Sequence, residues 1–93
     1  MQIKRQTLDG TKTAITFSGS FCGKWLVKNF TEGDIFVTFD EDATENESVK
    51  IASGMGQTVV ENERLGGLET FKHDTIYVTG TGEVEVQQLC FHR

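Results

Sequence analysis

Apolar and polar residues alternate along most of the sequence, and this alternation predicts β-strands with one buried face. In the clearest run, Ile35, Val37 and Phe39 face one side of the strand, while Phe36 and Thr38 face the other. These residues are β-branched or aromatic, which suits a pleated sheet. Further strands are expected at residues 2–8, 13–17, 24–30, 48–52, 57–61, 75–79 and 83–87. The pairs expected to share one face of a strand are Trp25 with Val27, Val49 with Ile51, Ile76 with Val78, and Val84 with Val86. Two strands leave an alternative open: Ile15 with Phe17 or Ala14 with Thr16 in the strand at 13–17, and Val59 or Val60 in the strand at 57–61.

Turn signals separate these runs. Ten glycines and no proline fit such an arrangement, because glycine adopts the positive φ that tight turns require. The Thr-Gly-Thr-Gly segment at residues 79–82 is expected to close a hairpin between the strands at 75–79 and 83–87. Residues 61–71 are expected to form a long loop, since Gly66-Gly67 ends a short run of helix formers.

The pattern as a whole predicts a single all-β domain over residues 1–93, the length of one domain. We expect a small antiparallel β-sandwich of about seven to eight short strands. A jelly-roll and an immunoglobulin-like strand order fit equally well. Residues 1–24 are expected to form an edge strand or an assembly arm, and Lys4 and Arg5 would discourage stray pairing at a sheet edge.

The charge of the chain changes the picture of its partners. The net charge is −5, which disfavours nucleic-acid binding because that function needs a basic face. Residues 1–28 carry five basic residues and one acidic residue, whereas the rest carries four basic and thirteen acidic residues. Such an asymmetry can favour head-to-tail association of identical subunits. The simpler interpretation is that these charges lie on a solvated surface and have no partner.

The sequence predicts neither a membrane protein nor a secreted one. No apolar run approaches the ~18 residues of a membrane helix, and the first seven residues lack the apolar stretch of a secretory signal. We therefore expect synthesis and folding in the cytosol. There, Cys22 and Cys90 are expected to be reduced thiols rather than a disulfide. No cysteine or histidine pair has metal-site spacing, so no metal or other cofactor is expected.

The acidic run from Asp40 to Glu47 is the most conspicuous polar segment. Its carboxylates are the type of ligand that calcium prefers, but the run lacks the glycine and the final glutamate of an EF-hand loop. We interpret it as a solvated loop between two strands. If it has a role, a partner with a basic patch is expected.

No constellation of residues indicates catalysis. His73 lies next to Asp74, but adjacent strand residues face opposite ways. Cys22 has no basic neighbour except Lys24, and His92 lies at the chain end. A catalytic histidine needs a nucleophile and an orienting group within reach. We therefore expect that the protein is not an enzyme.

Aromatic residues supply the candidates for an interface. Phe21, Phe30, Phe71 and Phe91 fall at strand ends or in loops, where they either form an interface or close the ends of the sandwich. The residues expected at an interface are Lys4, Arg5, Phe21, Trp25, Phe30, Asp40, Glu41, Asp42, Phe71 and Phe91.

Four segments carry a resemblance to a known group of proteins. They are Leu26–Phe30, Gly33–Phe39, Ser48–Gly54 and Asp74–Val86, which lie within residues 25 to 88. The chain resembles small, uncharacterised β-sandwich proteins encoded in phage and prophage virion gene clusters of Gram-positive bacteria. The motifs describe strands and contain no catalytic residues.

The resemblance implies a non-enzymatic virion structural protein: a head decoration protein, a fibre or spike base, or a neck or tail component. Its expected partners are other copies of itself, as a homo-oligomer, and other virion proteins, with assembly in the host cytoplasm. The alternative is a ligand-binding module for carbohydrate, in which Trp25, Tyr77 and loop aromatics stack on sugars.

Overall fold

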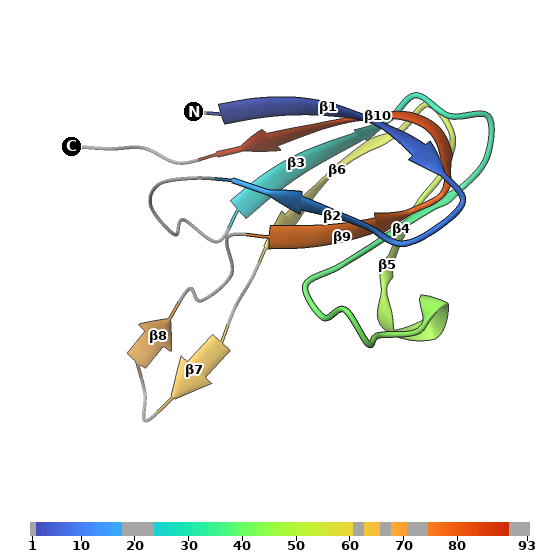
Figure 1. The fold of residues 1–93 in the computed structure, drawn as a ribbon. Helices are drawn as coiled ribbons and strands as arrows, with labels where there is room; N and C mark the ends of the chain where they lie inside the picture. Colours follow the sequence, from blue (N-terminus) through green and yellow to red (C-terminus); the bar gives the residue numbers. More distant parts are fainter. Residues whose placement is uncertain (1, 18–23, 61–62, 66–67, 71–74, 90–93) are drawn as a thin grey trace.

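The computed structural model describes residues 2–17, 24–60, 63–65, 68–70 and 75–89, and eight strands form two four-stranded sheets. Figure 1 shows the two sheets as stacked layers. Sheet A has the order β1 (Gln2–Asp9), β10 (Thr81–Gln88), β3 (Lys24–Asn29) and β6 (Gly56–Val60). Sheet B has the order β2 (Thr13–Thr16), β9 (Thr75–Thr79), β4 (Ile35–Thr38) and β5 (Val49–Ile51). The remaining elements are the single-turn 3₁₀ helix η1 (Glu45–Glu47) and the paired strands β7 (Glu63–Leu65) and β8 (Leu68–Thr70).

The order of the strands is that of a jelly roll. All pairs are antiparallel, and the chain crosses between the sheets at every connection of the sandwich except the one from β4 to β5. The prediction of a small antiparallel β-sandwich is therefore confirmed. Of the two strand orders that the sequence left open, an immunoglobulin-like order would place the last two strands in one sheet, whereas here β9 and β10 lie in different sheets.

The predicted hairpin between residues 75–79 and 83–87 is wrong for the same reason. Only Gly80 separates β9 from β10, and the chain turns a corner there from sheet B into sheet A. A Cβ atom at position 80 would lie 2.7 Å from Cγ2 of Ile35, so glycine allows the corner to close against the core. Glycine between two alternating runs signals a turn, but does not reveal whether the next strand pairs with the last one.

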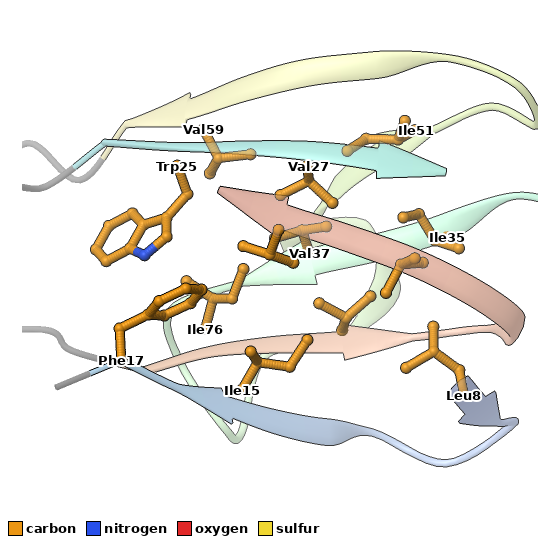
Figure 2. Close-up of a cluster of buried hydrophobic side chains, with 13 residues drawn as sticks. Leu8, Ile15, Phe17, Trp25, Val27, Ile35, Val37, Ile51, Val59 and Ile76 are labelled. Carbon is orange, nitrogen blue, oxygen red and sulfur yellow. The ribbon is translucent and has the colours of Figure 1, made fainter. Parts of the chain in front are cut away.

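The core lies between the sheets and confirms the predicted alternation (Figure 2). Among the residues whose burial the structure describes, thirteen apolar side chains are buried: Leu8, Ile15, Phe17, Trp25, Val27, Ile35, Val37, Ile51, Val59, Ile76, Val78, Val84 and Val86. Phe39 and Val49 pack against them and are partly buried. Every pair that the sequence placed on one face therefore points into the same layer.

The predicted loop at residues 61–71 is wrong in part. β7 and β8 pair antiparallel within it, with Glu63 opposite Thr70 and Leu65 opposite Leu68. Each of these strands has three residues, which is too short for alternation to be recognised in the sequence.

The N-terminal segment belongs to the sandwich. β1 pairs with β10 along its whole length at the edge of sheet A, and β2 pairs with β9 at the edge of sheet B. An edge strand is one of the two arrangements expected for residues 1–24. β1 and β2 each pair with a strand of the same chain, and a contact of this segment with a neighbouring subunit stays a prediction.

Candidate functional site

A buried asparagine organises one end of the sandwich. Asn29 ends β3 on the same face as Trp25 and Val27, and only 1% of it is exposed. Its Nδ2 donates to the carbonyl oxygen of Gly33 at 2.8 Å and to that of Ile51 at 2.9 Å. Its Oδ1 accepts the backbone N–H of Thr31 at 2.8 Å. One side chain therefore joins the β3–β4 loop to strand β5.

A further contact holds the same loop from its other side. The Ser53 hydroxyl donates to the carbonyl oxygen of Thr31 at 2.6 Å, and the Thr31 hydroxyl donates to the carbonyl oxygen of Gly33 at 2.7 Å. Because Thr31 is itself buried, these two hydrogen bonds are partly shielded from water. Residues 31–34 thus form a fixed rim.

This rim borders a cleft of about 460 Å³ on the outer side of sheet B. Phe36 lies in the cleft, because alternation turns its ring away from the core. The lining residues are Gly10, Thr31, Glu32, Gly33, Asp34, Phe36, Glu45, Thr79, Gly80 and Thr81. An aromatic ring among hydroxyls and carboxylates suits a small polar ligand, and the volume falls in the range of small-molecule sites.

The acidic run contributes one residue, Glu45, to the lining of the cleft. It connects β4 to β5 and lies on the side of sheet B that faces away from sheet A (Figure 1). Lys12 anchors it, since Nζ donates to the carbonyl oxygens of Glu41 at 2.6 Å and Ala43 at 2.7 Å. The backbone N–H of Thr44 donates to Glu47 Oε1 at 3.0 Å, and this hydrogen bond lowers the pKa of Glu47. The loop is exposed, as expected, but it is anchored at defined points.

The carboxylates of the cleft are mostly open to solvent. Glu32, Asp34 and Glu45 are all exposed. Lys50 Nζ lies 3.3 Å from Asp34 Oδ2 and offsets one of the three charges. The cleft is therefore acidic, with oxygen atoms that accept hydrogen bonds from a ligand's hydroxyl or amino groups.

On sheet A, the outer face carries a row of charges across three neighbouring strands. Glu85 of β10 lies opposite Arg5 of β1 and Lys28 of β3. Arg5 Nε is 3.0 Å from Glu85 Oε1, and Lys28 Nζ is 3.7 Å from Glu85 Oε2. Gln87 Nε2 donates to Oε2 at 2.8 Å. The hydrogen bond from Gln87, and then that from Arg5, lowers the pKa of Glu85.

The same sheet holds the exposed apolar residues. The large hydrophobic side chains that are exposed among the described residues are Ile3, Phe30, Met55 and Val60. Ile3 and Val60 lie on the edge strands β1 and β6, while Phe30 follows β3 and Met55 precedes β6. Exposed apolar side chains gather on surfaces that bind other proteins. Ile3 and Val60 lie on opposite edges of sheet A, so these side chains mark exposed apolar positions on and beside this sheet rather than one patch.

The two basic residues predicted at an interface, Lys4 and Arg5, lie in different surroundings. Lys4 and Arg5 lie on opposite faces of β1, so they do not form one patch. Lys4 Nζ donates to the carbonyl oxygen of Thr16 and lies 5.4 Å from the centre of the Phe17 ring. Arg5 binds Glu85. Much of the basic charge of residues 1–28 is therefore engaged within the chain, which weakens the head-to-tail interpretation.

The remaining predicted interface residues differ in position. Phe30 is 56% exposed, and Asp40, Glu41 and Asp42 are exposed in the acidic loop. Their part in an interface stays a prediction. Phe21, Phe71 and Phe91 lie outside the described residues, as do Cys22, Cys90, His73, Asp74 and His92.

Trp25 was expected at an interface, and this expectation is wrong. Its exposed fraction is 0%, and its ring centre lies 5.2 Å from that of Phe39 between the sheets. Trp25 is therefore available neither to a partner nor to a sugar. The cause is visible in the alternation, which places it beside Val27 on the inward face. Tyr77 is half-buried on the outer side of sheet B, opposite Ala14 and Thr38.

Among the described residues, no group of three or more His, Cys, Asp or Glu side chains is placed to hold a metal ion. No described helix has the length and apolar character needed to cross a membrane.

Sequence reasoning missed the residues that build the cleft. Phe36 was correctly placed on the outward face of its strand, and an aromatic residue at such a position is the signal that could have marked it. Asn29 gave no signal, because its partners at positions 31, 33 and 51 come together only in the fold.

Comparisons with protein-family models, with curated proteins and with solved structures found no match for this chain.

Proposed function

We propose that the protein is a non-enzymatic structural component of a phage or prophage virion that acts by self-assembly or by docking onto other virion proteins. The observation that carries this proposal is the jelly-roll order of the strands, an architecture that viral capsid domains use. A fold alone does not specify function, so the surface matters as well. The four exposed apolar side chains on or beside sheet A support a protein-binding role.

The test is whether the protein is part of assembled particles. Particles are purified on a density gradient from the phage or induced lysogen that encodes the chain, washed at high salt, and analysed by peptide mass spectrometry. We expect peptides of this chain in the particle fraction, at a fixed ratio to the other virion proteins.

A deletion of the coding sequence completes this test. We expect the deletion to reduce the yield of particles or alter their shape in electron micrographs, and expression from a plasmid to restore both. Normal particles without the protein, together with its absence from wild-type particles, would overturn the proposal.

The cleft favours one second candidate, a module that binds carbohydrate. With Trp25 buried, Phe36 is the aromatic surface available in this cleft, surrounded by Thr79, Thr81 and Glu45. Sugars are bound by stacking on an aromatic ring and by hydrogen bonds from their hydroxyl groups to carboxylates.

Titration calorimetry with a panel of mono- and disaccharides tests this candidate. Binding that is lost in Phe36→Ala and retained in Phe30→Ala would support it, because Phe30 is an exposed aromatic residue that does not line the cleft. No heat of binding at millimolar sugar would exclude it.

A further inference from the structure

The two edges of sheet A differ in how they are protected. An edge strand presents unpaired N–H and C=O groups that pair readily with another strand, and charged side chains discourage such pairing. β1 carries Lys4 and Arg5, whereas β6 reads Gly-Gln-Thr-Val-Val and has no charge. Among the described residues, β6 pairs with β3 alone and no strand covers its other edge.

The hydrogen bonds show which residues of β6 face this free edge. The N–H of Asn29 donates to the carbonyl oxygen of Met55 at 2.8 Å, whereas the N–H of Phe30 donates to that of Glu83 at 3.1 Å. Odd-numbered residues of β3 therefore bond to β6, and even-numbered ones bond to β10. From the register, Gln57 and Val59 bond to β3. The N–H and C=O groups of Gly56, Thr58 and Val60 are thus directed toward the free edge.

The sequence of β6 complements itself in an antiparallel pair. If two copies meet about Thr58, Thr58 lies opposite Thr58 and Gly56 lies opposite Val60. Pairs of threonine across strands are favourable, and no like charges meet. The corresponding pairing of β1 would place Arg5 opposite Arg5, which is unfavourable.

A partly apolar groove lies beside the same edge. Its volume is about 310 Å³, and it runs between β5 and β6, where the two sheets leave one side of the sandwich open. Its apolar lining is Val37, Phe39, Val49, Val59 and Val60, and its polar lining is Thr38, Glu47, Gln57 and Thr58. Val60 is 49% exposed. A neighbour that pairs with β6 would remove this apolar surface from water.

We infer that β6 is the edge through which two copies of the chain associate, by antiparallel pairing of β6 with β6 into a continuous eight-stranded sheet. The partner is a second copy because the strand is uncharged and complementary to itself. The pairing rests on the proposed assembly role and gives it a specific contact.

Light scattering of the purified chain over a range of concentrations tests the pairing. We expect a monomer–dimer equilibrium that does not loosen with salt, because the contact contains no ion pairs. Thr58→Pro removes an N–H group on the free edge without removing a bond to β3, and is expected to weaken the dimer at least tenfold. Thr58→Lys should do the same, because it places two like charges opposite each other.

Thr7→Pro is the matched control. The N–H of Phe30 donates to the carbonyl oxygen of Glu83, and the N–H of Leu89 donates to that of Lys24, so the odd-numbered residues of β10 bond to β3. The even-numbered residues of β10 therefore bond to β1. Thr7 lies opposite Glu83, so its own backbone groups face the free edge of β1. The same substitution there should leave the dimer unchanged. Hydrogen exchange of the wild type gives a second measure, with amides of Thr58 and Val60 protected as concentration rises and those of Arg5 and Thr7 unaffected.

Two results would overturn the pairing: a wild-type monomer up to millimolar concentration, or a dimer that Thr7→Pro weakens and Thr58→Pro does not. Either result leaves the particle experiment to decide the virion role. Conversely, a β6 dimer from a protein that is absent from particles would retain the pairing and remove the virion role.

Discussion

The two ends of strand β3 close the same sandwich by different means. Trp25 and Asn29 lie four residues apart on one face of the strand, and both are buried. At one end, the Trp25 ring packs against Phe39 at an angle of 50° and lies beside Phe17 (Figure 2). At the other end, the Asn29 side chain makes three hydrogen bonds to the backbone.

The difference determines what each end tolerates. The aromatic end depends on volume, because dispersion and burial have little direction. The polar end depends on the placement of donors and acceptors, because a buried group without a partner is costly. The polar end also positions the candidate site, since Asn29 holds the rim of the cleft.

The largest expected effect comes from removing volume at the aromatic end. Trp25→Ala should lower the free energy of unfolding by about 4 kcal/mol, because it leaves a cavity between the sheets. Urea unfolding followed by circular dichroism measures the loss. Phe30→Ala is the control, and its exposed ring should cost less than about 1 kcal/mol. Similar losses in the two variants would show that Trp25 is not part of the core.

At the polar end, a change of chemistry without a change of shape should be nearly as harmful. Asn29→Asp replaces the Nδ2 donor by an oxygen that faces the carbonyl oxygens of Gly33 and Ile51. Gly33 keeps the Thr31 hydroxyl as a partner, but Ile51 loses its side-chain donor. We expect a loss of about 3 kcal/mol in urea unfolding.

Asn46→Asp is the matched control for Asn29→Asp, because Asn46 is exposed in η1. It should change stability by less than about 0.5 kcal/mol. If Asn29→Asp is equally mild, the hydrogen bonds of Asn29 contribute little and the contrast between the two ends fails.

A change of chemistry at the aromatic end should be mild. Among the described residues, Nε1 of Trp25 is a buried donor without a hydrogen-bond partner. Trp25→Phe therefore removes no hydrogen bond and keeps an aromatic ring, so it should cost about 1 kcal/mol in urea unfolding. A loss as large as that of Trp25→Ala would mean that the indole N–H has a role that packing does not explain.

The smallest effect is expected on the outer face of sheet A, where Lys28 of β3 and Arg5 of β1 flank Glu85 of β10. The pKa of Glu85 lies below its ordinary value of 4.5 in the folded chain. The ionised form therefore stabilises the fold above that value, and the contribution is lost as pH falls through the folded-state pKa. Relative to Glu85→Gln, the wild type should unfold at a higher urea midpoint near neutral pH.

This advantage should shrink as the pH falls below about 4.5. Urea midpoints of both proteins between pH 7 and pH 3 provide the measurement. A difference that is constant over this range would show that the charge of Glu85 does not stabilise the fold.

The sequence by itself determined which face is buried in most of the strands of the sandwich. Ile35, Val37, Ile76 and Val84 point inward because the period of two is a local property of an extended chain, and water excludes apolar side chains wherever the strand lies. The same alternation marked the outward position of Phe36. The predictions at this level are confirmed.

Only the tertiary structure decided which strands pair and which polar groups meet. Gly80 carries the chain into the other sheet because the space beside Ile35 admits no side chain, and that space exists only in the folded core. Trp25 is lost as an interface residue because a second sheet covers it. Asn29 came to hold the rim of the cleft that Phe36 lines because segments distant in sequence meet there, and contacts of this kind leave no periodic trace in the chain.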